Sequence, residues 1–145
     1  MTRTPWLAAA AVFALLGCRN RDLERARTFE VHDAWVRADP DTGTVTAGYL
    51  RFVNGTDDSV VVSRFASDAA RSVELHRSWA DSAGIMHMTP ENAAHLAPHA
   101  TLVMQPGGYH LMLIGTTRPL GAGQRVRITM RLSSGAIVST MARIR

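Results

Sequence analysis

The sequence predicts an all-β fold for residues 29–145, an antiparallel β-sandwich or barrel. Short runs rich in β-branched and aromatic residues follow one another, and Gly, Pro, Asn and Asp cluster between them. The sequence shows neither an internal repeat nor a long amphipathic helical pattern. With 145 residues, 46% of them apolar, the chain is long enough for one domain with a hydrophobic core.

The N-terminal segment is expected to lie outside this fold. Residues 1–17 have Arg3 near the start and an apolar run too short to span a bilayer, as in a signal peptide. The stretch 15–18 (LLGC) resembles the lipobox of bacterial lipoproteins, in which cleavage precedes a cysteine that is then lipidated. We predict a signal peptide at 1–17, a lipidated Cys18 and a charged tether at 18–28. The protein would then be a membrane-anchored lipoprotein of the periplasm or cell envelope; a plain secretory signal is the alternative.

The strands are predicted from alternation of apolar and polar residues. Residues 124–132 are typical, because Val126 and Ile128 face one way while arginines face the other. Met130 follows this alternation and is predicted to pack in the core, and the same is expected of Met104 and Met141. The predicted strands are residues 29–38, 47–54, 59–67, 71–77, 85–88, 101–104, 109–115, 124–132 and 136–144.

Charge and cysteine content exclude several classes of function. The 16 basic residues are all arginine, they are scattered, and the net charge is only +4, so a nucleic-acid-binding surface is not expected. Cys18 is the only cysteine, so the mature domain cannot supply the thiolate of a blue-copper electron-transfer site. It also contains no disulfide.

Histidine and methionine break the alternation in three neighbouring segments, 71–77, 85–88 and 109–115. His76 faces outward at the end of the first segment, just before a predicted loop (RSWADSAG). Met88 lies in the second segment. In the third segment, His110 and Met112 lie on the face opposite two leucines, where solvent-facing polar residues would be ordinary. This face is therefore predicted to be an exposed binding site.

The residue types at these positions favour a particular metal. Thioether sulfur is a soft neutral ligand and imidazole is borderline, so together they suit Cu(I) better than zinc, calcium or magnesium. His110 and Met112 are two apart on one strand, about 6.5–7 Å between Cα atoms, and can close on one ion. A zinc hydrolase would need three nitrogen or oxygen ligands and a base, which the methionine pair disfavours.

The spacing of these residues resembles that of the periplasmic copper chaperone family PCuAC. The family pattern is His, ten residues, Met, twenty-one residues, His, one residue, Met. The spacings from Met88 to His110 and from His110 to Met112 match this pattern. Between His76 and Met88 there are eleven residues, one more than in the pattern. DAWVRA, AGYLRFVN, VELH, MHM and PGGYHLMLIG also resemble family segments, so the likeness covers most of 29–145.

This resemblance implies a Greek-key β-sandwich of cupredoxin-like type that binds one Cu(I). The implied ligands are His76, Met88, His110 and Met112. It also implies delivery of copper to a copper-accepting protein, such as a cytochrome c oxidase subunit with its dinuclear centre, or an assembly thiol protein, and no enzymatic activity. If the inserted residue displaces His76, Met86 or His87 would be the replacement ligand. A copper buffer or resistance protein remains the alternative function, and a metal-free structural lipoprotein is the simplest one.

Other candidates are expected to have no metal role. They are Met86 (packing), His87 (opposite face), His95 and His99 (polar loop), His32 (hydrogen-bonded) and Trp35 (core). For Trp79, in the predicted loop between two ligands, shielding of the metal and ordinary packing are both open.

Overall fold

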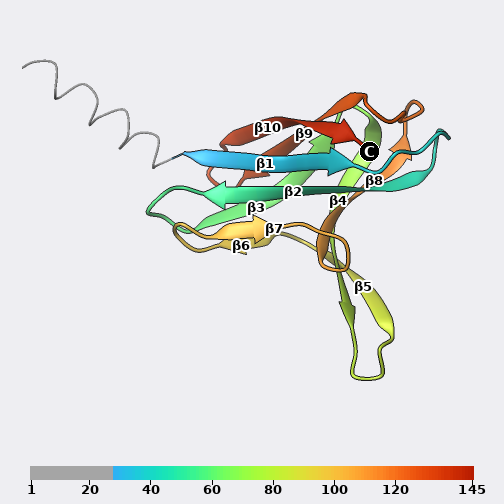
Figure 1. Ribbon diagram of the computed structural model, residues 1–145. Coiled ribbons are helices and arrows are strands. Elements are labelled where there is room, and N and C mark those ends of the chain that lie inside the picture. The colour runs from blue at the N-terminus through green and yellow to red at the C-terminus, as the bar shows by residue number, and fades with distance from the viewer. Residues whose placement is uncertain (1–27) are drawn as a thin grey trace, which may run out of the picture.

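The protein is all-β in the computed structural model, which describes residues 28–145 (Figure 1). No helix occurs within these residues, and so none that is long and apolar enough to cross a membrane. The strands are β1 (Phe29–Val36), β2 (Val45–Asn54), β3 (Val60–Ser67), β4 (Ala70–Ala80), β5 (Met86–Glu91), β6 (Ala94–Leu96), β7 (Thr101–Val103), β8 (Tyr109–Thr116), β9 (Arg125–Leu132) and β10 (Ile137–Ile144).

Seven strands form a closed barrel. Their order is β4-β8-β2-β1-β10-β9-β3, and the pairing of Phe65 on β3 with Val73 on β4 closes the ring. β1 and β10 are parallel, and the other pairings between described strands are antiparallel. β5, β6 and β7 extend the sheet outside the ring, on β4, β3 and β2 respectively. The predicted all-β Greek-key, cupredoxin-like class is confirmed.

The inward side chains of the ring form one hydrophobic core. Phe52, Leu111 and Leu113 are fully buried, and so are Ile128 and Met130 on β9. Burying each such side chain contributes roughly 1.5–3 kcal/mol to folding, so this core stabilises the barrel. Because the leucines of β8 point inward, the alternate residues of β8 must point out of the barrel.

The β4–β5 hairpin projects beyond the barrel as an arm, defined here as residues 78–88 (Figure 1). β8 begins at Tyr109, opposite Arg77, so β4 beyond that point pairs with β5 alone. The turn at its tip covers 81–85, where the Asp81 amide donates to the Ile85 carbonyl at 2.9 Å.

Several expectations about single segments were wrong. The stretch predicted as a loop after His76 continues β4 to Ala80, because it pairs with β5. The polar loop predicted around His95 contains β6, whose Ala94 and Leu96 are buried against the core. Met141 is 46% exposed rather than packed in the core.

Trp35 is another correction, since it is half-buried and packs on the Tyr49 ring at 4.4 Å rather than in the barrel core. The signal peptide at 1–17, the lipidated Cys18 and the tether lie outside the described residues, apart from Thr28.

Candidate metal centre

Strand pairing places all four predicted ligands on one outer face of β5, β4 and β8. His76 lies directly opposite His110, and Met88 lies opposite Ser78, which is two residues from His76. Met112 is two residues from His110 on β8. Residues opposite each other, or two apart on one strand, share a face of the sheet. Segments that are far apart in sequence are thereby brought together.

Three of the four residues line a common pocket of about 270 Å³. Met88, His110 and Met112 form one side of it. The remaining lining comes from the segment directly after β1 and from the start of β2: Arg37, Ala38, Asp39, Val45, Thr46 and Ala47. His76 does not line this pocket. It lies beside it, with its ring centroid 6.0 Å from that of His110.

His110 presents one ring nitrogen that is free to bind a ligand. Its Nδ1 lies 3.0 Å from the Gly108 carbonyl oxygen. A carbonyl only accepts, so Nδ1 carries the proton and donates, which leaves the lone pair on Nε2. The turn before β8 holds that carbonyl in place, since the Gly108 amide donates to Gln105 and Gly107 has a positive φ of 79°.

The ring of His110 is enclosed rather than exposed. The centroid of the His110 ring lies 6.4 Å from that of the Tyr49 ring, and His110 is only 7% exposed. The prediction of a fully exposed face is therefore wrong for His110. A buried ring on a rigid strand keeps one orientation, which suits a metal ligand.

His76 has the opposite arrangement of ring nitrogens. Its Nε2 lies 3.0 Å from Oε2 of Glu74, and a carboxylate accepts, so Nε2 carries the proton. Nδ1 is buried and has no hydrogen-bond partner in the described part of the chain. Leaving such a nitrogen unpaired costs about 1–3 kcal/mol. A metal ion bound at Nδ1 would satisfy it.

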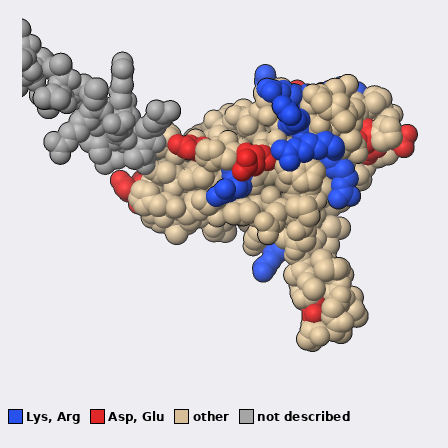
Figure 2. All heavy atoms as spheres, in the orientation of Figure 1, with Lys and Arg blue, Asp and Glu red and all other residues tan. Residues whose placement is uncertain are grey.

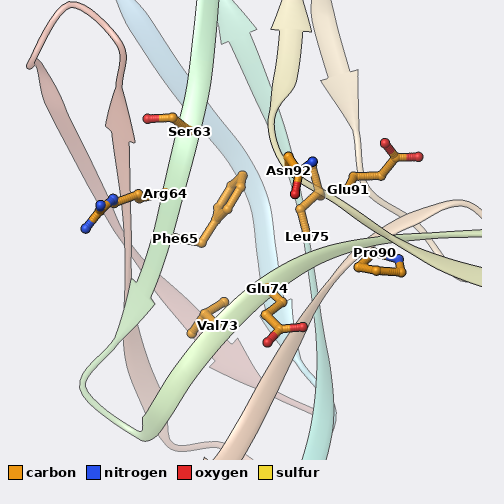
Figure 3. A pocket seen from close by; sticks show the side chains of 9 residues that line it. All are labelled: Ser63, Arg64, Phe65, Val73, Glu74, Leu75, Pro90, Glu91 and Asn92. Atoms are coloured by element: carbon orange, nitrogen blue, oxygen red, sulfur yellow. The ribbon is translucent and has the colours of Figure 1, made fainter.

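Glu74 was not predicted as a site residue. It lies opposite Met112 on the neighbouring strand and also lines a second pocket, of about 330 Å³, between β3, β4 and the end of β5. Figure 3 shows Glu74 at the edge of that pocket, together with Pro90 and Glu91. The sequence signal was its position two residues before His76, which puts both side chains on one face.

The two methionines complete the donor set. Met88 is 53% exposed on the arm, and Met112 is half-buried between its strand neighbours Ala47 and Glu74. Neither residue belongs to the barrel core, so core packing does not explain them. Two thioethers and two imidazoles form a neutral set of soft and borderline donors, which favours Cu(I). Residues 28–145 hold no group of three or more His, Cys, Asp or Glu that could bind a metal.

The extra residue between His76 and Met88 does not disturb this face. Pairing of β4 with β5 runs without a register shift from Leu75–Glu91 to Ala80–Met86. The additional residue is therefore accommodated in the turn at 81–85, and His76 stays opposite His110.

The remaining histidines lie elsewhere. His87 points to the opposite face of the arm, where it stacks on Trp79 at 4.5 Å. His99 pairs with Asp57 and His32 with Glu30, both at exposed positions. His95 is exposed on β6.

Solved structures of other proteins are similar to this chain in fold. The PCuAC domain of PmoF2, solved with copper bound, covers 81% of this chain and 92% of its own with a TM-score of 0.66 and 24% identity. Cu(I)-bound DR1885 from Deinococcus radiodurans is 28% identical, with a TM-score of 0.57 over 79% of this chain and 76% of its own. Both likenesses agree with the closed barrel described above.

Sequence comparison is consistent with these structures. The protein named "Putative lipoprotein Lxx21020" from Leifsonia xyli subsp. xyli is 30% identical over 148 residues, covering 94% of this chain and 88% of the relative. Residues 29–144 match the family described as "Putative lipoprotein LpqE-like". This match spans the whole barrel and the arm, and the chain belongs to the LpqE-like family.

Proposed function

We propose that this protein is a copper chaperone that carries one Cu(I) and passes it to a copper-accepting protein. The observation that carries the proposal is the shared outer face of β5, β4 and β8. There Met88, His110 and Met112 line one pocket, and His76 lies beside them. Each histidine has one ring nitrogen whose lone pair its hydrogen-bonding partner leaves free, Nε2 in His110 and Nδ1 in His76. The ion is cargo, and no catalysed reaction is involved.

The solved relatives support the cargo. DR1885 has been determined in a Cu(I) state, and the PmoF2 domain has been determined with copper bound. The donor set of this chain suits the same ion, because thioethers and imidazoles are soft and borderline ligands. The carboxylate of Asp39 also lines the pocket, where it accepts hydrogen bonds from the Thr44 hydroxyl and the Asp41 amide.

The cellular setting follows from the family and from the sequence. The family and the Leifsonia relative are both named as lipoproteins, and Cys18 lies at the end of a signal-like segment. We infer a lipid-anchored protein of the cell envelope, working in the periplasm. The recipient would be the dinuclear copper centre of cytochrome c oxidase or one of its assembly factors.

A competition titration tests the cargo. The protein, titrated without oxygen against a Cu(I) chelator, should take up one equivalent of Cu(I), and Zn(II) should bind far more weakly. His110→Ala should reduce the Cu(I) affinity, whereas His95→Ala, on β6, is the matched control and should not. Equal or tighter zinc binding would contradict the proposal.

A second experiment tests delivery. Cells lacking the protein should assemble less copper-loaded cytochrome c oxidase at low copper, and the wild-type chain should restore it. Normal oxidase together with increased sensitivity to excess copper would instead indicate a buffer.

A further inference from the structure

The arm has two faces, and the side chains on one of them are accounted for by ring stacking and hydrogen bonds. Trp79 stacks on His87 with an interplanar angle of 21°, and His87 Nε2 lies 2.8 Å from Asp81. The other oxygen of Asp81 accepts from the backbone amides of Ala83 and Ile85, both at 2.9 Å. These contacts fix the hairpin and its turn without any contribution from the opposite face.

The opposite face carries two methionines that packing does not explain. Met86 is 59% exposed, and its cross-strand neighbour is Ala80. Met88 faces the equally small Ser78. Neither neighbour can cover a thioether. Asp81 is the only acidic residue of the arm, which is otherwise tan in Figure 2.

Met86 extends the row of thioether sulfurs away from the pocket. It lies two residues before Met88 on β5 and so shares its face, at a Cα separation of about 6.5–7 Å. Met88 lines the pocket, whereas Met86 lies next to the turn at the outer end of the arm. An ion could therefore move from one sulfur to the other along a single strand.

We propose that Met86 is an additional Cu(I)-binding residue, an outer station through which the ion enters and leaves the site. The inference rests on the copper-chaperone function proposed above. On entry a Cu–S bond to Met86 forms as the bond to the donor's ligand breaks, and the bond to Met86 then breaks as one to Met88 forms. On release the bond to Met88 is exchanged for one to Met86, which breaks as the acceptor's ligand binds. A thioether carries no proton, and the ion stays Cu(I), so neither protons nor electrons are exchanged.

If Met86 has this role, removing its sulfur should slow the transfer of Cu(I) without changing the dissociation constant. Met86→Leu keeps the size of the side chain and removes the sulfur. Transfer of Cu(I) from the loaded full-length chain to bicinchoninate should slow by at least about threefold, while the dissociation constant stays within about twofold. Met141→Leu is the matched control, because Met141 is similarly exposed but lies on β10, which pairs with β9 and β1 away from the site.

Methyl-labelled methionine gives an independent readout in the wild-type chain. Substoichiometric Cu(I) should shift or broaden the ¹³C-methyl signals of Met88, Met112 and Met86, and it should leave the signal of Met141 unchanged. Thermal unfolding of Met86→Leu should match the wild type, which shows that the substitution leaves the fold intact.

The outcomes separate this inference from the proposed function. If Met88 and Met112 respond to Cu(I) while Met86 neither shifts nor affects the transfer rate, the station is overturned and the chaperone site stands. If Met86→Leu lowers the affinity as much as the rate, Met86 is an equilibrium ligand and the station is overturned as well. If no methionine methyl responds, the proposed function itself fails.

Discussion

At the scale of single residues, the site depends on which nitrogen of each histidine is free. Glu74 and the Gly108 carbonyl engage different ring positions, so His76 offers Nδ1 and His110 offers Nε2. Partners of this kind orient metal ligands and raise their basicity. Glu74 is therefore a positioning residue for His76.

Substituting Glu74 tests this assignment. Glu74→Ala should weaken Cu(I) binding by about 10–100-fold, because His76 loses the partner that holds its proton on Nε2. Glu74→Gln keeps an acceptor oxygen and should retain most of the affinity. Chelator competition measures the affinity, and ¹⁵N NMR of the imidazole reports the tautomer. Equal losses in both variants would show that the charge matters and the hydrogen bond does not.

The two histidines should contribute alike. His76 lies directly opposite His110 with its ring centroid 6.0 Å away, so His76→Ala should weaken Cu(I) binding about as much as His110→Ala. The same competition assay compares the two variants. If His76→Ala left the Cu(I) affinity unchanged, His76 would be only a neighbour of the site. The Cu(I) affinity of His87→Ala would then be measured in the same assay.

The sequence could place the four candidate ligands on one outer face, because their spacing resembles a known family pattern and alternation assigns their faces. It could not predict Arg37 and Asp39, which reach the pocket from the segment directly after β1. That segment is brought close by the pairing of β1 with β2 and of β2 with β8 together. Glu74 was missed because an outward carboxylate on a strand is ordinarily a solvated residue.

At the scale of elements, the arm depends on the turn that Asp81 organises. Hydrogen bonding from His87, and then from the Ile85 backbone amide, lowers the pKa of Asp81 below its ordinary value. The folded state thus favours the carboxylate. The resulting stabilisation is present above the unfolded pKa and is lost as pH falls through the folded pKa.

Acidification should therefore loosen the turn. Below about pH 4 the amides of Ala83 and Ile85 should lose protection from hydrogen exchange, while the barrel strands stay protected. Asp81→Asn should show weaker protection at neutral pH and little change on acidification. An unaltered pH profile in that variant would contradict the role given to Asp81.

Strand prediction succeeded where alternation was long and failed where it was short or mixed. β9 alternates over its whole length, and its buried residues are those expected. β6 has only three residues next to Pro98, too few to give a clear period. In β10 apolar residues occur on both faces, so Met141 could not be assigned to the core or the surface from sequence.

At the scale of the whole molecule, a closed barrel supports an outer binding face. The ring leaves no strand edge between β4, β8 and β2, so the residues behind the pocket are held by pairing on both sides. The more exposed arm then supplies the accessible ligands. Inward side chains of the barrel strands therefore provide stability, while outward side chains of β4 and β8, together with Met88 of the arm, form the candidate site.

A core substitution should separate these two properties. Phe52→Ala removes a fully buried ring on β2 that stacks with Phe29 at 5.7 Å, and should lower the free energy of unfolding by about 3–5 kcal/mol. Below its melting temperature, the variant should still bind one Cu(I). Denaturant unfolding measures the first effect and chelator competition the second. Loss of copper binding in the folded variant would show that the site depends on core packing.

The central claim is that this face binds Cu(I) through thioether and imidazole groups together. X-ray absorption of the Cu(I)-loaded chain tests it most directly, since sulfur and nitrogen scatter at different distances. We predict a mixed shell of two sulfur and two nitrogen donors in the wild type, with one sulfur lost in Met112→Leu. A shell of nitrogen and oxygen alone, unchanged in Met112→Leu, would contradict the account.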